Sequence, residues 1–479
     1  SQDQVVAEGI RSYLELWERG GASRVLLVTP WAAQLQGRQG YFTVRVSPNA
    51  HTALRAQSSD GQAPPIELGD EDRWGWLARE ALPGESFGEL AGRLLGVPRY
   101  ESALIVAAWA GLSEELRWLA WVWGQTRLGA DTLGDAVISA SPSPDRLAET
   151  VALYATDHAL DPAETRERRE LLRRMSREGL PATFWLAFEG ERDPLTKLRM
   201  LPGLSQRERE QIVLVVAELL RTTVGAESWM PHLEATFPEL AAYLTRFPYA
   251  DPHLREYMRL YTRCKVMDKA SDELLALSRT WVSDRALWNW PSRAELLRKA
   301  TPTPRHWVDG LGVEWAGLLG SLLNDGRVQA EVNLGRAELP TSTGYNRDWQ
   351  PNERVERDLD SMAHAYNYSY PSTFVQQLDW VAALADKLRD ECLTGGSLLI
   401  SGDHGLTRFA VQGQRIIPPA GCEVHKWGRY AMLPDGAPAP EGDAWRVYNN
   451  CLVLAGHSLF EGSRAPIGGE AHGGATVEE

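Results

Sequence analysis

Long apolar segments are missing from this chain of 479 residues. No stretch is long enough to cross a bilayer as a helix, and the first residues lack the basic and apolar regions of a signal peptide. Cysteine is scarce. The chain has four cysteines, which lie far apart and form no Cys-x-x-Cys pair. An excess of positive charge is missing too, since the formal net charge is −14. These absences predict a reduced, cytoplasmic protein without a membrane role, and they argue against a surface that holds nucleic acid by bulk charge.

The composition is that of a globular protein, with 43% hydrophobic and 24% charged residues. A chain of this length is expected to form two or three domains. The 19 tryptophans are unusual, and many lie in apolar helical stretches such as residues 117–123. We interpret them as packing residues of the core.

The first section, residues 1–140, has the pattern of a small α/β domain. Three segments rich in apolar or β-branched residues are predicted strands, Ser23 to Thr29, Tyr41 to Val46 and Ala103 to Ala108. Ser113 is the predicted N-cap of the helix that follows them.

The second section, residues 141–300, begins at the breaker-rich joint Ser141 to Asp145 and is predicted to be helical. Its apolar residues recur with helical period. The predicted helices are Glu164 to Glu178, Ser205 to Thr222, Leu254 to Val282 and Arg293 to Ala300.

The last section, residues 301–479, returns to alternating strands and helices after the joint Thr301 to Pro304. This alternation predicts a mostly parallel sheet flanked by helices. Six of the ten histidines fall here, so this section is expected to carry the chemistry. The predicted strands are His306 to Val308, Arg327 to Leu334, Ser397 to Ser401 and Trp445 to Leu454. The predicted helices are Glu314 to Leu323 and Tyr370 to Arg389, and Pro371 lies in the first turn of the second.

Two acids follow predicted strands of this section. The run Leu398 to Gly402 ends in Asp403, His404 and Gly405. Asp and neutral His both bind zinc-class metals, and ligands collect beyond the carboxyl ends of parallel strands. Asp309 follows the strand ending at Val308, where an acid taken alone favours an N-cap over a metal ligand.

Asp360 and His364 stand four residues apart, so they share one helix face and could bind one ion. A surface pair is the alternative, and Glu356 is a competing acid one turn earlier. His472 lies in a glycine-rich loop, where it is either a ligand or a free loop histidine.

Two further segments offer groups for a phosphate. The loop Pro340 to Asn346 is rich in hydroxyls, which either cap a helix or include a nucleophile. The segment His425 to Tyr430 offers Lys426 and Arg429 as contacts to phosphate oxygens, although it could equally be a strand with an exposed polar face.

Together these residues suggest a two-metal site. Asp309, Asp403 and His404 form one set of three ligands. Asp360, His364 and His472 form the second. Mixed carboxylate and imidazole sets suit zinc or manganese better than calcium, so we expect two divalent ions of that class.

The order of these motifs resembles the alkaline phosphatase superfamily of metal-dependent phosphoryl and sulfuryl hydrolases. The matching pieces are Val308-Asp309-Gly310, Pro340-Thr341-Ser342-Thr343, Gly402-Asp403-His404-Gly405 and His472. The loop Pro-Thr-x-Thr looks like the nucleophile loop of the phosphodiesterase branch, which makes Thr343 the expected nucleophile. More narrowly, residues 307–479 look like a PglZ domain, through Tyr370-Pro371 and the closing stretch from His472 to Glu479.

The resemblance carries several expectations. PglZ proteins belong to BREX phage-defence systems of bacteria, so other defence proteins are expected partners and nucleic acid or a nucleotide is a candidate substrate. The fold expected for residues 301–479 is the alkaline-phosphatase-like sheet, truncated at its C-terminus because the domain of relatives continues further. The expected reaction is hydrolysis of a phosphoric ester through a phospho-Thr343 intermediate. The alternative is an assembly platform in a defence complex, with the acidic, Trp-rich helical middle as its partner surface.

Overall fold

The computed structural model describes residues 4–20, 24–29, 31, 34, 47–82, 84–127, 132–175, 179–222, 224–283, 289–300, 303–324, 326–351, 353–438, 440–463 and 469–479. The chain forms two compact units, one of Ser1–Asp157 with Glu170–Pro181 and one of His158–Arg169 with Ala182–Glu479. The architecture is mixed α/β, and its largest parallel sheet has three strands. None of the described helices is both long and apolar enough to cross a membrane.

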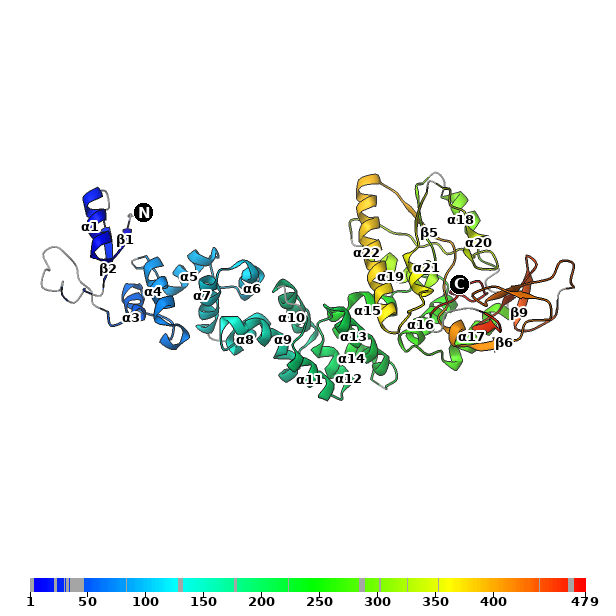
Figure 1. Ribbon diagram of the computed structural model, residues 1–479, viewed down its shortest axis with the longest axis horizontal. Helices are drawn as coiled ribbons and strands as arrows, with labels where there is room; N and C mark the ends of the chain where they lie inside the picture. The colour runs from blue at the N-terminus through cyan, green and yellow to red at the C-terminus, as the bar shows by residue number, and fades with distance from the viewer. Residues whose placement is uncertain are drawn as a thin grey trace. The chain divides into compact units, whose positions relative to one another are not determined.

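The first unit is mainly helical (Figure 1). Its two described strands pair in parallel, with Gln4 opposite Arg24. In chain order the elements are β1 (Gln4–Glu8), α1 (Gly9–Arg19), β2 (Arg24–Val28), α3 (Ala50–Gln57), α4 (Glu71–Glu80), α5 (Phe87–Leu95), α6 (Ser102–Ala108), α7 (Glu114–Gln125), α8 (Leu133–Ala140) and α9 (Leu147–Asp157), with 3-10 turns η2 (Ile66–Leu68), η3 (Trp109–Gly111) and η4 (Pro144–Arg146).

Tryptophan packing forms the core of the first unit. The predicted cap is confirmed, because the Ser113 side chain accepts a hydrogen bond from Leu116 N and α7 begins at the next residue. Trp118 on α7 is fully buried, donates its indole N–H to Leu68 O at 2.7 Å and meets Trp74 edge-on at 5.0 Å. An edge-to-face pair of this kind adds to the stabilisation from buried apolar area. The interpretation of these tryptophans as core residues is confirmed.

Helices also make up the first part of the second unit, and α10 contributes residues to both units. The predicted cap Ser205 opens α13, whose apolar residues from Ile212 to Leu219 are buried except for the exposed Leu214, as the helical period predicts. The helices are α10 (Pro162–Arg174), α11 (Ala182–Gly190), α12 (Pro194–Met200), α13 (Gln206–Leu219), α14 (Ala226–Thr236), α15 (Pro238–Thr245), α16 (Pro252–Val266), α17 (Asp272–Ser283) and α18 (Arg293–Lys299).

The strands described in the rest of the second unit form three small sheets. A parallel sheet has the order β4-β3-β5, a parallel pair joins β11 to β6, and an antiparallel sheet has the order β7-β8-β10-β9. The elements are β3 (Arg305–Val308), α19 (Val313–Leu323), α20 (Thr343–Asn346), β4 (Arg354–Glu356), α21 (Asp358–Ala363), α22 (Ser372–Gly395), β5 (Leu399–Gly402), α23 (Phe409–Gln412), β6 (Gln414–Ile416), β7 (Glu423–Val424), β8 (Tyr430–Met432), β9 (Trp445–Tyr448), β10 (Cys451–Leu454) and β11 (Ser458–Phe460).

The parallel sheet β4-β3-β5 positions the candidate site. Its central strand pairs His306 with Arg354 on one side and Val308 with Gly402 on the other, so the three strands end at one edge. Helices α19 and α22 pack against each other beside this sheet (Figure 1). This confirms the predicted alternation of parallel strands with covering helices, but only for a small sheet.

Two predictions of secondary structure in the helical sections are wrong. Residues 103–108 form α6 rather than a strand, because three alanines favour helix and the segment packs on α8. The predicted long helix from Leu254 to Val282 is two helices, α16 and α17, broken where Asp268 takes a left-handed backbone conformation with φ 49°. The predicted strand Tyr41 to Val46 lies outside the described residues.

The predicted strand Arg327 to Leu334 is also wrong, although its alternating pattern is real. Its odd-numbered residues are exposed and its even-numbered ones are half-buried, as in a strand. The segment pairs with no described strand, and the position of a Cβ on Gly320 of α19 lies 3.2 Å from Val332 Cγ2. The apolar side therefore packs on a helix instead of joining a sheet.

The segment Trp445 to Leu454 is not one strand, as predicted, but a hairpin of β9 and β10. The sheet that contains this hairpin is antiparallel, so the prediction of a mostly parallel arrangement is also wrong for this part of the unit. Asn449 and Asn450 have φ of 48° and 57°, as a two-residue hairpin turn requires. Asn tolerates this left-handed conformation better than most residues. Cys451 consequently pairs with Tyr448, and β10 continues antiparallel to β8.

Candidate metal centre

Two aspartates directly follow the carboxyl ends of the neighbouring strands β3 and β5. Asp309 follows β3, and Asp403 follows β5. Asp403 Oδ1 accepts hydrogen bonds from Gly310 N at 3.1 Å and from His404 N at 2.9 Å. These bonds to backbone N–H groups fix the Asp403 carboxylate against the turn that carries Asp309. Asp309 is not an N-cap, because α19 begins after Gly312.

The two glycines around Asp403 and His404 are required by close backbone contacts. A Cβ on Gly402 would lie 2.1 Å from Leu311 O. A Cβ on Gly405 would lie 1.8 Å from Glu478 O. The turn therefore passes against two other backbone segments, and glycine is the residue that allows this approach.

The first ligand set consists of Asp309, Asp403 and His404, which are all buried. His404 Nδ1 lies 3.0 Å from Gly405 O and can only donate there, which leaves the Nε2 lone pair free to bind. His404 Nε2 lies 3.5 Å from Asp309 Oδ1 and 3.4 Å from Asp403 Oδ2. Asp403 Oδ2 is buried and has no hydrogen-bond partner among the described residues.

The second set consists of Asp360, His364 and His472. Asp360 lies on α21 and His364 ends that helix, so their four-residue spacing places both on one face. Asp360 Oδ1 lies 3.2 Å from His364 Nε2 and 3.8 Å from His472 Nε2. His472 Nδ1 donates to Thr341 O at 3.1 Å, which again leaves Nε2 as the free acceptor.

The two sets are neighbours. The rings of His404 and His472 stack with centroids 4.0 Å apart, and His364 lies 5.0 Å from His472. The structure thus brings together all six predicted ligands from four separate segments of the chain. Asp360 has the most exposed side chain of the six, at 23%, so its set lies nearer the solvent than the first.

Both sets fit a divalent ion of the zinc class. Bonds of about 2.0–2.1 Å from zinc to nitrogen or oxygen place tetrahedral ligand atoms about 3.3 Å apart. The ligand atoms of the first set are separated by 3.4 and 3.5 Å and those of the second by 3.2 and 3.8 Å. Asp360 Oδ1 and both ring nitrogens of His364 have no described hydrogen-bond partner despite their close approach. A cation between them, or a proton on His364, would satisfy this buried pair.

The pKa values of the ligands in the two sets also favour a bound cation. Burial raises the pKa of Asp309 to about 7, and the charges of Asp403 and Asp360 add to the effect. Burial and the neighbouring His404 and His364 hold the pKa of His472 well below its usual range, so this ring is neutral and able to bind a metal. For Asp360, burial opposes ionisation, but His364, His404 and Lys426 lower its pKa overall. A bound cation would relieve the repulsion between the acids.

Thr343 faces the first set. It is the first residue of α20, and its hydroxyl Oγ1 lies 3.1 Å from His404 Nε2 and 3.4 Å from Asp309 Oδ1. Its side chain is only half-buried, so a substrate can reach it. Of the alternatives for this loop, helix capping does not apply, because the Ser342 side chain makes no cap bond to α20.

The two predicted phosphate contacts have different surroundings. Arg429 is fully buried, forms a bidentate pair with Glu479 and donates to Gly456 O and Ser458 O. Four of its five N–H groups are used, so the assignment of Arg429 to phosphate is corrected to a structural role. Lys426 is exposed, and its charge acts on Asp360, so it remains available to a phosphate.

Some neighbours of the site were missed from the sequence. Thr341 joins the hydroxyl loop to the histidine loop, because its Oγ1 donates to Gly474 O at 2.9 Å and accepts from Gly473 N at 3.1 Å. Trp427 stacks on His364 with ring centroids 3.8 Å apart. The competing acid Glu356 is occupied elsewhere, by Lys387 and Arg354. The sequence carries no local signal for these partners, which come from distant segments.

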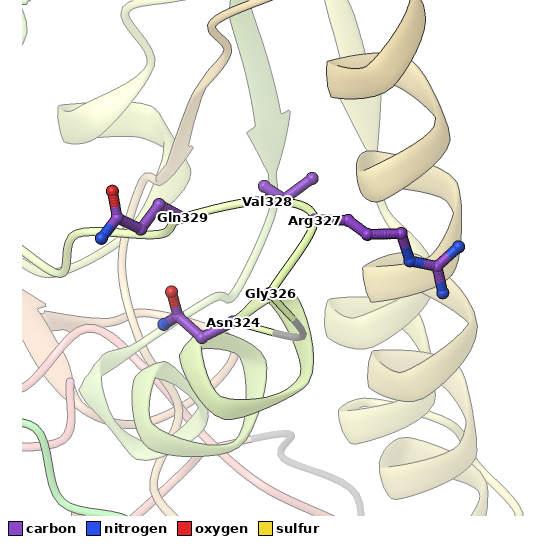
Figure 2. A pocket seen from close by; sticks show the side chains of 5 residues that line it. All are labelled: Asn324, Gly326, Arg327, Val328 and Gln329. Atoms are coloured by element: carbon purple, nitrogen blue, oxygen red, sulfur yellow. The ribbon is translucent and has the colours of Figure 1, made fainter.

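A separate hollow lies in the loop after α19 (Figure 2). Arg389 on the second half of α22 donates to Leu322 O, which places the end of α19 near the start of β5. The hollow therefore lies toward the start of β5, whereas Asp403 follows its end, and none of the six candidate ligands lines it. Its lining residues are Asn324, Gly326, Arg327, Val328 and Gln329.

Comparison of the chain with protein-family models, with curated proteins and with solved structures gives no match.

Proposed function

We propose that this protein is a metal-dependent hydrolase of phosphoric esters, a phosphodiesterase, nuclease or phosphatase. The observation that carries the proposal is the placement of the Thr343 hydroxyl 3.1 Å from a ligand atom of one three-residue set, with a second set stacked against the first. A nucleophile beside two adjacent cation sites suits in-line displacement at phosphorus. Zinc or manganese fits the mixed ligands best.

The narrower proposal is a PglZ domain with an alkaline-phosphatase-like fold, acting in BREX phage defence. Support comes from the sequence motifs and from their placement at one edge of a parallel sheet, where Asp309 follows β3 and Asp403 follows β5. The proposed partners are other proteins of the defence system, and the proposed compartment is the cytoplasm.

In the proposed reaction, Thr343 Oγ1 attacks phosphorus and the ester oxygen on the opposite side leaves with its electron pair. The Thr343 hydroxyl donates to Asp309 Oδ1 at 3.4 Å, and because that oxygen is a proposed cation ligand, the hydroxyl proton passes to water when Oγ1 attacks. Water then attacks the phospho-Thr343, the bond from Oγ1 to phosphorus breaks, and the hydroxyl is regenerated. Lys426 is exposed and close enough to Asp360 to lower its pKa, so it can attract the anionic ester. Two bound ions would supply the positive charge that offsets the charge developing on the phosphate oxygens.

Hydrolysis of bis-para-nitrophenyl phosphate tests the proposal. We expect turnover that a chelator abolishes and that added zinc or manganese restores. Thr343→Ala should remove it, by at least roughly a thousandfold, while Thr343→Ser retains a hydroxyl and part of the rate. Mass spectrometry of the quenched reaction should find a para-nitrophenyl phosphoryl group on Thr343, because only one of the two ester groups of the substrate has left. Equal background rates in the wild type and Thr343→Ala would refute the hydrolase.

An assembly platform is the rival. In the form expected from the sequence it uses the tryptophans of the helical middle as a partner surface. Trp185 and Trp229 in that region are at most 8% exposed, which favours a core role for them. A platform also gives no reason for paired sets of buried acids and histidines. The chelator experiment separates the two functions, because a platform has no turnover to lose.

If the substrate is a nucleic acid, we propose that partners deliver it. The net charge of −14 opposes tight binding of a polyanion by the isolated protein. A strong, salt-dependent mobility shift of DNA caused by the protein alone would contradict this.

A further inference from the structure

The three candidate histidine ligands are not oriented in the same way. His404 and His472 each donate Nδ1 to a backbone carbonyl, of Gly405 and Thr341 respectively. Such a bond fixes both the tautomer and the plane of a metal-binding imidazole. His364 has no hydrogen-bond partner at either ring nitrogen among the described residues. Its close polar neighbour is Asp360 Oδ1, 3.2 Å from Nε2, and this contact lacks the hydrogen-bond geometry that would fix the ring plane.

Trp427 is in position to do so. Its ring stacks on His364 with centroids 3.8 Å apart and planes within 8°. Parallel rings this close leave the imidazole little freedom to rotate, and they hold Nε2 at 3.2 Å from Asp360 Oδ1.

The segment that carries Trp427 is itself held tightly. It is the turn between β7 and β8, closed by hydrogen bonds from Gly428 N to His425 O at 2.7 Å and from His425 N to Tyr430 O at 3.0 Å. Gly428 has φ 72°, and a Cβ there would lie 2.3 Å from Ser463 Cβ. A rigid turn therefore presents the indole to His364.

We propose that Trp427 is a positioning residue that orients His364 for cation binding and thereby sets the affinity of the second site. The inference rests on the metal-binding part of the proposed function. Trp427 lies farther from His472, with centroids 6.4 Å apart, and the first set is oriented by its own bonds to Gly310 and Gly405. The effect of Trp427 should consequently be confined to the binding step that fills the second set.

Calorimetric titration of metal-free full-length protein with Zn²⁺ tests this. Trp427→Leu keeps apolar bulk but removes the flat ring, and it should weaken one of the two binding steps about 10- to 100-fold while leaving the other unchanged. Trp427→Phe restores a ring that can stack and should recover most of the affinity. Trp445→Ala is the matched control, because it removes an indole from the same antiparallel sheet, where that ring meets Phe460 rather than a ligand.

Several outcomes would overturn the inference. Unchanged affinities in Trp427→Leu would show that the stack does not orient His364, while equal weakening of both steps, or no recovery with Phe, would show a merely structural role. Failure of the hydrolase is a separate result, since wild-type protein that binds two Zn²⁺ but cleaves no ester removes the proposed function and leaves this inference standing. Wild-type protein that binds no Zn²⁺ overturns both.

Discussion

Replacing Arg429 by methionine removes the only cation that contacts the Glu479 carboxylate among the described residues. The pair is bidentate, and both side chains are fully buried. The guanidinium also donates to Gly456 O at 2.8 Å and to Ser458 O at 2.6 Å. Methionine fills much of the volume but carries no charge and donates no hydrogen bond. The variant therefore separates the loss of the ion pair and its hydrogen bonds from a loss of packing volume.

The expected destabilisation is large. Leaving one partner of a buried ion pair uncompensated costs about 3–5 kcal/mol. Each buried carbonyl that loses its donor costs roughly a further 1–3 kcal/mol where water cannot replace it. Since whole domains are stable by only about 5–15 kcal/mol, Arg429→Met should lose a large share of the stability of the second unit. An arginine that merely contacted phosphate at the surface would change stability by about 0.5 kcal/mol or less.

Urea unfolding followed by hydrogen exchange on peptides of the second unit measures this change. Adding Glu479→Gln to Arg429→Met should recover a large part of the loss, because no buried charge then remains unpaired. Lys426→Met is the matched control, since it neutralises an exposed cation in the same turn. Near wild-type stability of Arg429→Met, together with a raised KM for bis-para-nitrophenyl phosphate, would refute the structural role and return Arg429 to the phosphate.

Three other changes have defined outcomes. Gly405→Ala places a Cβ 1.8 Å from Glu478 O and should destabilise the second unit by about 1–3 kcal/mol or more in urea unfolding, whereas Gly395→Ala, with open space around it, should not. Burial opposes ionisation of Glu478, but His457, Thr407 and Tyr257 hold its pKa at about 2 against an ordinary 4.5. Its contribution of about 3 kcal/mol is therefore complete above pH 4.5 and lost as the pH falls to 2, so acid titrations of wild type and Glu478→Gln should converge near pH 2; parallel curves would contradict this. Trp118→Ala should destabilise the first unit by about 3–5 kcal/mol by hydrogen exchange, while the exposed Trp17→Ala should change it by less than about 0.5 kcal/mol.

The sequence by itself identified the residues that gather at the candidate centre. Asp309, Asp403 and His404 were visible because acids and histidines stand directly after short apolar strands, and parallel strands end at one edge. Asp360 and His364 were visible because a spacing of four residues defines one face of a helix. Both signals are local features of the sequence. They predict the positions of side chains correctly when the strand or helix that carries them forms as predicted.

Only the tertiary structure decided the environment of each group. Arg429 and Lys426 stand three residues apart and look alike in the sequence, yet one is neutralised by Glu479, 50 residues away, and the other stays exposed. The segment Arg327 to Leu334 kept its strand-like alternation but found a helix as its neighbour. A sequence gives the type of each side chain and the spacing at which apolar and polar residues alternate. Its charge partner, its burial and the ring stacked on it depend on contacts between distant segments, and those are determined when the whole unit packs.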